Sequence, residues 1–192
     1  MPRLVGPAVS AGRLSSKDQP ELVVDELALR PWLEADAPAI VQAYRDPAIQ
    51  RWHARSMTEL EATAWVRSWN DRWATETGAG WAVVDSAGLL LGRVDLRRLD
   101  LLEGTGEAGY WVAPRARGRG VAGRALRAVA DWMFTEIGLH RIDLEHSTFN
   151  EPSCRVAVKA GFVLEGTKVS SALHADGWHD MHLHARVNDQ AR

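Results

Sequence analysis

The sequence predicts an α+β domain in which helices pack on a mixed β-sheet. Its apolar residues switch several times between the helical period of 3.6 and the strand period of 2. No segment repeats, which excludes a solenoid or propeller. The 192 residues, 46% of them hydrophobic, suffice for one domain with a substantial core. We expect that domain to cover residues 22–192, after a flexible tail at residues 1–21 that is rich in Gly, Ser and Pro.

The strand pattern is apolar alternation bounded by Gly, Pro, Asp or Ser. The expected strands cover residues 23–30, two stretches within 80–99 separated by a turn at 86–88, and residues 107–114, 140–147, 161–169 and 177–187. They predict a twisted sheet of six to seven strands. Neighbours joined by short turns are expected to be antiparallel.

Four helices are expected to flank this sheet. They cover residues 36–44, 58–74, 118–137 and 150–159. Pro47 should end the first, and Thr58 followed by Glu61 matches a capping box at the start of the second. Gly138 is placed to cap the third helix at its carboxyl end.

Composition excludes several kinds of protein. Lys and Arg total 23 against 25 Asp and Glu, a formal charge of -2, so no overall field attracts nucleic acid or an anionic membrane. No segment approaches the roughly 20 apolar residues of a membrane span. Pro2, Gly6 and Pro7 interrupt the apolar run that a signal peptide needs. Cys154, the only cysteine, cannot form an intramolecular disulfide, so we expect a reducing, cytoplasmic setting.

The most informative segment is PRARGRGVAGRAL, residues 114–126, between a strand and an amphipathic helix. Its glycines let an anion approach the backbone, and the first helical turn leaves N–H groups unpaired under a partial positive charge. This combination predicts a phosphate cradle. Four arginines could add cationic donors: Arg115, Arg117, Arg119 and Arg124. The spacing matches neither a P-loop nor a dinucleotide-binding turn, and an arginine-rich surface loop is the alternative.

This segment resembles the signature of the GNAT superfamily, Arg/Gln-x-x-Gly-x-Gly/Ala, which residues 117–122 fit. The likeness covers about residues 22–187, and the branch it resembles is the RimJ/RimL-like one, named for ribosomal-protein N-terminal acetyltransferases. It also includes GYWVAP at 109–114, Asn150-x-x-Ser153, KAGFVLEG at 159–166 and GWHDMHLHAR at 177–186. The resemblance implies a GNAT fold.

The resemblance also implies that acetyl-coenzyme A is the co-substrate and that an amine is the acceptor. Backbone N–H groups at the helix start would bind the pyrophosphate, and the strand ending at Val112 would pair with the pantetheine amides. The implied coenzyme-binding residues are Trp111, Val112, Arg117, Gly118, Arg119, Gly120, Val121, Ala122, Gly123, Asn150 and Ser153.

Acyl transfer to an amine needs a base, because an alkyl ammonium with a pKa near ~10 is protonated at neutral pH. Glu107 is our candidate base, since strand alternation places it on the face of Trp111, although a solvated carboxylate is the alternative. The N–H of Val112 is the predicted oxyanion donor. Ser153 is the candidate proton donor to the leaving thiolate, or else a helix cap. Many GNAT enzymes use a tyrosine where this chain has Ala157.

Several other features have two interpretations. Trp65, Trp69 and Trp73 share a helix face, which either packs on the sheet or lines an acceptor pocket. Trp52 and His53, in a predicted loop, are acceptor-side candidates. The face shared by Asp180, His182 and His184 could ligate a metal, but alternation on a half-exposed strand gives the same pattern. We therefore predict no metal.

The predicted activity is direct transfer of an acetyl group from acetyl-coenzyme A to a primary amine, on a protein N-terminus or a small molecule. The alternatives are a non-catalytic sensor of acyl-coenzyme A and an acyltransferase that uses succinyl-coenzyme A or another thioester. A homodimer is compatible with the sequence, with the last strands as contact edges.

Overall fold

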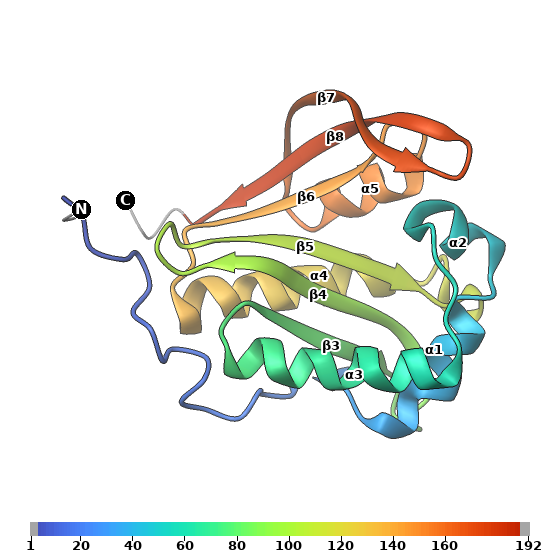
Figure 1. Ribbon diagram of the computed structural model, residues 1–192, viewed down its shortest axis with the longest axis horizontal. Coiled ribbons are helices and arrows are strands. Elements are labelled where there is room, and N and C mark those ends of the chain that lie inside the picture. The colour runs from blue at the N-terminus through green and yellow to red at the C-terminus, as the bar shows by residue number, and fades with distance from the viewer. Residues whose placement is uncertain (1–3, 189–192) are drawn as a thin grey trace.

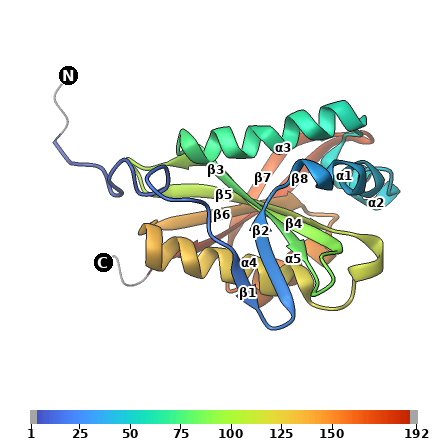
Figure 2. The same cartoon turned by 90° about the horizontal axis from the view of Figure 1, so that it is seen from below.

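The computed structural model describes residues 4–188 as one twisted eight-stranded sheet with helices on both faces (Figures 1 and 2). The strand order is β1-β2-β3-β4-β5-β6-β8-β7, and only β5 and β6 are parallel. The strands are β1 (Leu22–Val24), β2 (Leu27–Pro31), β3 (Gly78–Val84), β4 (Leu90–Asp100), β5 (Thr105–Val112), β6 (Arg141–Ser147), β7 (Val163–His174) and β8 (Gly177–Val187).

Five α-helices cover the sheet. They are α1 (Ala37–Ala43), α2 (Pro47–His53), α3 (Glu59–Ala74), α4 (Val121–Trp132) and α5 (Glu151–Lys159). Figure 2 shows α3 on one face of the sheet and α4 on the other. A π-helical turn, Met133–Ile137, extends α4 to the predicted end at Gly138, which is left-handed with φ 87°.

The predicted α+β class is confirmed, with small differences in the number of elements. The first predicted strand is a hairpin of β1 and β2, because Asp25 turns the chain with φ 51°. Pro47 begins α2 rather than only ending a helix, since a proline in the first turn lacks only an N–H that would be unpaired anyway. The Asp46 carboxylate accepts from the Ile49 N–H at 3.0 Å and caps this helix. Trp52 and His53 therefore lie on α2 and not in a loop.

The capping box of α3 forms as predicted. The Glu61 N–H donates to Thr58 Oγ1 at 3.3 Å, and the Thr58 N–H donates to Glu61 Oε2 at 2.8 Å. The tryptophan face of α3 packs on the sheet, where Trp69 and Trp73 are buried, and Trp65 and Trp69 also line a cavity on the same side of the sheet. Gly80 on β3 makes room for this contact, because a Cβ there would lie 2.6 Å from the Trp69 ring.

The segment before β1 has no helix or strand in residues 4–20, yet it packs on the domain. Val9 and Leu14 are buried in the main core, and the Glu76 carboxylate accepts from the N–H groups of Gly12 and Leu14 at 2.8 and 2.7 Å. Buried apolar side chains and paired backbone groups fix a segment without secondary structure. This packing differs from the predicted flexible tail; residues 1–3 lie outside the described residues.

The feature that positions the site is a divergence between β5 and β6. The two strands pair only from Thr105 opposite Arg141 to Ala108 opposite Leu144. Beyond these pairs, residues 109–112 of β5 continue along β4, while β6 stays with β8 and moves away (Figure 1). The backbone edge of β5 is therefore open at the centre of the sheet.

Candidate active site

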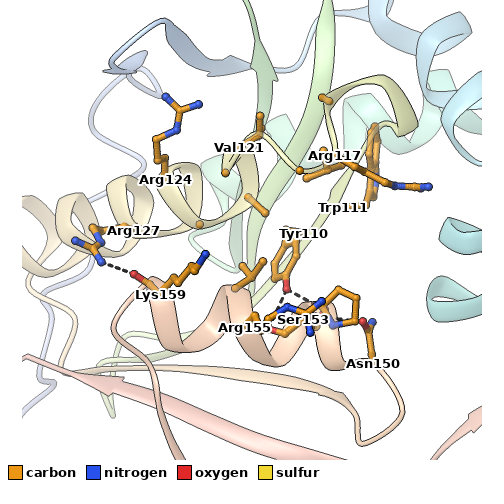
Figure 3. Close-up of a pocket in the computed structure, with 18 of the residues that line it drawn as sticks. Tyr110, Trp111, Arg117, Val121, Arg124, Arg127, Asn150, Ser153, Arg155 and Lys159 are labelled. Atoms are coloured by element: carbon orange, nitrogen blue, oxygen red, sulfur yellow. Dashed lines mark hydrogen bonds between the residues drawn. The ribbon is translucent and has the colours of Figure 1, made fainter.

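A cavity of about 980 Å³ lies where β5 and β6 diverge, between the first turns of α4 and α5. Figure 3 shows Tyr110 and Trp111 on β5, the start of α4 on one side and α5 on the other. A volume of this size is in the range of ligand sites for large cofactors. All the residues that the sequence predicts for coenzyme binding, except Arg119, line it.

The start of α4 has the geometry of an anion cradle. Gly118 and Gly120 have φ values of 75° and 72°, which a side chain would strain, and Gly120 is the N-cap residue. The Arg124 N–H donates to the Gly120 carbonyl at 3.1 Å, so the preceding N–H groups, at residues 121–123, have no acceptor within the helix. No side chain caps this end of the helix. The N–H groups face the cavity under the positive end of the helix dipole.

Most of the arginines in this turn hold the protein together rather than facing the cavity freely. Arg117 pairs with Asp46, Arg115 donates to the Leu90 carbonyl, and Arg124 pairs with Asp25 and Glu26. Three other cations line the cavity from α4 and α5 and were not singled out from the sequence: Arg127, Arg155 and Lys159 (Figure 3). This end of the cavity is thus basic in a chain with a formal charge of -2.

The Val112 N–H points into the opening. The Ala113 N–H donates to the Leu91 carbonyl on β4 at 2.8 Å, and backbone groups along an antiparallel strand alternate in direction. The N–H of Val112 consequently points away from β4, toward the side that β6 has left. The Trp111 backbone borders the same cavity, while its side chain is buried against Tyr44 on the other face of the sheet, with ring centroids 6.0 Å apart.

A tyrosine that sequence analysis did not single out lies beside Ser153. The Tyr110 hydroxyl donates to Ser153 Oγ at 2.9 Å (Figure 3), and burial raises the pKa of Tyr110 to about 12. Asn150 caps α5 by accepting from the Ser153 N–H at 3.2 Å. Both hydroxyls are therefore protonated at neutral pH. They lie where this cavity meets a second cavity, because both residues line the two of them.

A second cavity, of about 360 Å³, opens on the α3 side of the sheet. It shares five lining residues with the first: Trp52, His53, Tyr110, Asn150 and Ser153. Its other walls come from α3, β4, β6 and the β7–β8 hairpin. Burial and the neighbouring Arg93 and Arg97 lower the pKa of His53 to about 3, so this ring is neutral at physiological pH. We call this second space the acceptor cavity.

Asp95 on β4 is the buried carboxylate of the acceptor cavity. It is 1% exposed and lies 3.0 Å from Arg93, and burial raises its pKa despite that arginine. Its Oδ2 has no hydrogen bond among the described residues. Gly109, opposite Asp95 on β5, leaves it space, since a Cβ there would lie 3.1 Å from Oδ1. A buried carboxylate with a raised pKa in a cavity is a candidate general base.

Glu107, the base expected from the sequence, has different surroundings. Its two oxygens accept from Arg97 and Arg98, each at 2.6 Å, and it lines neither cavity. Both oxygens are thus already occupied, and the side chain joins β5 to β4. The predicted catalytic role of Glu107 gains no support from this geometry.

Comparison with known proteins identifies the family. Residues 26–163 match the acetyltransferase (GNAT) domain. The chain belongs to the GNAT acetyltransferase family. It is 29% identical over 161 residues to YdaF of Bacillus subtilis (strain 168), named as a candidate ribosomal N-acetyltransferase, covering 83% of this chain and 78% of that protein.

Solved structures show the same GNAT fold. The ribosomal-protein-S5-alanine acetyltransferase from Vibrio fischeri superposes with a TM-score of 0.83 at 22% identity, over 91% of this chain and 100% of that one. RimL, a ribosomal L7/L12 alpha-N-protein acetyltransferase solved in complex with coenzyme A, gives 0.81 at 19% identity, over 88% and 97%. This GNAT protein is an acetyl-coenzyme A-dependent N-acetyltransferase. Among residues 4–188, no helix has the length and apolar character to span a membrane.

Proposed function

We propose that the acceptor is the N-terminal α-amine of a protein whose first side chains are neutral or acidic. The observation that supports it is the charge of the acceptor cavity. Four arginines line the cavity against two carboxylates: Arg55, Arg72, Arg93 and Arg97 against Asp95 and Glu145. Asp95 is paired with Arg93, Arg97 with Glu107 and Glu145 with Lys168, which leaves Arg55 and Arg72 without an ion pair among the described residues. The lining is therefore net positive.

This charge disfavours a polyamine. A polyamine brings several ammonium groups, and each one beyond the reacting amine would face arginines in a partly desolvated space. A peptide N-terminus brings one amine, whose pKa of about 7.7–8.0 is below that of an alkyl amine. A larger fraction of such an amine is already unprotonated at neutral pH. Acidic side chains that follow the N-terminal residue would be attracted to Arg55 and Arg72.

In the proposed mechanism, the acceptor amine enters from the acceptor cavity and acetyl-coenzyme A lies along β5 from the other side. Asp95 accepts the ammonium proton, directly or through water, and the free amine attacks the thioester carbonyl. The Val112 N–H stabilises the resulting oxyanion. Tyr110, through Ser153, delivers a proton to the leaving thiolate. The N–H groups at the start of α4 hold the pyrophosphate, with Asn150 and Ser153 across the cavity.

A panel of acceptors tests the proposal. With acetyl-coenzyme A, we expect peptides with Asp or Glu at positions 2–4 to be acetylated with higher kcat/KM than lysine-rich peptides or spermidine. Arg55→Gln should reduce this preference, while Arg45→Gln, at an exposed arginine that lines neither cavity, should not. Turnover of spermidine above all peptides would contradict the proposed acceptor. Parallel assays with succinyl-coenzyme A in place of acetyl-coenzyme A show which donor gives the higher kcat/KM.

We further propose that the protein forms a homodimer through β7. This strand is the outer strand of the sheet, and residues 163–171 are exposed on both faces. Its exposed large apolar side chains are Val163, Leu164, Val169 and Leu173. A second copy of β7, related by a two-fold axis, would pair the free edge and cover these side chains.

We also propose a cytoplasmic location. Several of the relatives are named for ribosomal proteins, and the single cysteine fits a reducing compartment. Cell fractionation with detection of the native chain would test it.

A further inference from the structure

Four side chains with metal-binding atoms meet beneath α5, outside the proposed acetyl-transfer chemistry. They are His146 on β6, Cys154 on α5, and His182 and His184 on β8. One ligand atom from each lies within 4.8 Å of all the others. His146 is opposite His182 in the β6–β8 register, and His184 is two residues further along the same face. We call these residues the His₃Cys cluster.

We propose that the His₃Cys cluster is a tetrahedral Zn²⁺ site. His146 Nε2 lies 3.2 Å from His184 Nε2, and Cys154 Sγ lies 3.9 Å from the same nitrogen. With Zn–N of about 2.0–2.1 Å and Zn–S of about 2.3 Å, tetrahedral ligand atoms are separated by roughly 3.3–3.6 Å. These two separations are close to those values, and every other pair of ligand atoms lies within 4.8 Å. Three imidazoles with one thiolate favour Zn²⁺ over hard cations.

The surroundings of His146 orient its free nitrogen toward the cluster. Its Nδ1 lies 2.8 Å from the Ser147 carbonyl, which can only accept, so Nδ1 carries the proton. Nε2 is left with a lone pair, and it is the atom that faces His184. A backbone carbonyl that fixes the other ring nitrogen in this way is typical of metal-binding histidines.

A metal-free network does not satisfy these atoms equally well. His184 Nε2 can donate to His146 or accept from the Cys154 thiol, but it cannot do both in one neutral tautomer. His182 Nδ1 is buried with no hydrogen-bond partner among the described residues. One cation at the centre would supply a partner for the inward lone pairs and for the thiolate, whose proton passes to solvent on binding.

The site differs from the arrangement considered from the sequence. Asp180 is not part of it, because its carboxylate accepts from the Ser170 N–H at 2.8 Å. His146 and Cys154, distant in sequence from β8, take its place. Because Cys154 follows Ser153 and His146 lines the acceptor cavity, the ion would fix the first turn of α5 beside the site without touching the reacting atoms. It would replace the expectation that the protein contains no metal.

The single cysteine makes a direct test possible. Untagged, chelator-treated protein is titrated with Co²⁺ and Zn²⁺, and Cys154 modification by a thiol reagent is followed. We expect one Co²⁺ per chain with thiolate-to-cobalt absorption and tetrahedral d–d bands. Zn²⁺ at 100 times its Kd should slow thiol modification about 100-fold, since only the unliganded fraction reacts. A chelator should restore the rate.

Substitutions distinguish metal binding at the His₃Cys cluster from metal binding elsewhere on the protein surface. His182→Gln keeps the thiol and should lose the Zn²⁺ protection, and Cys154→Ser should lose the charge-transfer band. His140→Gln, at a histidine outside the cluster, should keep both signals. If wild-type Cys154 reacts at the same rate with and without saturating Zn²⁺, the site does not exist. Protection that persists in His182→Gln would equally overturn the His₃Cys assignment.

Discussion

Asp95 and Glu107 lie on adjacent strands, and their surroundings differ in one respect that matters for proton transfer. Asp95 is buried in an ion pair with Arg93 and lines the acceptor cavity, while Glu107 lies outside both cavities with its two oxygens held by Arg97 and Arg98. The same functional group is therefore a candidate base at one position and a link between strands at the other. Only residue-scale geometry separates them.

We expect Asp95→Asn to lower kcat by about 10²–10⁴-fold while the KM for acetyl-coenzyme A changes little, because a general base contributes about that much. Glu107→Gln is the matched control and should retain most of the turnover. Steady-state kinetics with both substrates give the result. A larger loss of kcat in Glu107→Gln would return the base to Glu107.

The pH profile provides a second measurement on Asp95. A base acts only when deprotonated, and burial raises the Asp95 pKa above its ordinary value near 3.9. In wild type, kcat/KM should therefore fall as the pH is lowered through this raised pKa, and the acidic limb should begin above the ordinary aspartate range. Asp95→Asn should lose that limb. An unchanged limb in the variant would assign it to another group.

At the scale of elements, the start of α4 shows how a local motif forms the proposed phosphate site. The glycines allow left-handed backbone, the helix begins at Val121, and its first N–H groups face the cavity. The first two of these properties depend on residues close in sequence, while the cavity itself forms where β5 and β6 diverge. The neighbouring arginines behave differently, because their partners Asp46, Leu90 and Glu26 come from distant elements.

We expect Gly120→Glu to abolish measurable binding of acetyl-coenzyme A, because it places a carboxylate at the proposed phosphate site. The side chain also costs about 1–2 kcal/mol in a left-handed backbone. Gly88→Glu is the matched control, since Gly88 has φ 77° in a turn with open space and lies outside both cavities. Calorimetric titration measures both. If the two variants bind acetyl-coenzyme A equally well, the start of α4 is not the phosphate site.

At the scale of the whole molecule, the segment before β1 contributes to the core although it lacks regular structure. We expect Leu14→Ala to lower the free energy of unfolding by about 2–5 kcal/mol, as for other fully buried leucines. Leu4→Ala, at a fully exposed leucine, should change it by less than about 0.5 kcal/mol. Denaturant unfolding gives both values. If Leu14→Ala leaves the free energy of unfolding unchanged, the flexible tail predicted from the sequence is favoured.

Association through β7 also belongs to the whole molecule. Sedimentation of the wild type should give twice the chain mass at micromolar concentration. Leu173→Glu, which places a charge among the exposed apolar side chains, should shift it to the monomer. Leu89→Glu, at an exposed leucine between β3 and β4, should leave the mass unchanged. A wild type that sediments as a monomer would exclude the dimer.

The sequence by itself determined the α+β class, the capping box of α3 and the glycine turn before α4. These depend on hydrogen bonds and backbone preferences within a few residues, which spacing reveals. The sequence does not determine a helix boundary where one residue has two possible local roles. Pro47, for example, can end one helix or begin the next.

Only the tertiary structure decided which polar groups meet. Strand alternation places Glu107, Gly109 and Trp111 on one face, but it cannot say that two arginines hold Glu107 or that Asp95 occupies the space beside Gly109. Likewise, the divergence of β5 from β6 brings Tyr110 to Ser153, and β6, α5 and β8 together bring Cys154 to three histidines. Such contacts depend on sheet order and helix packing, which bring together residues far apart in the chain.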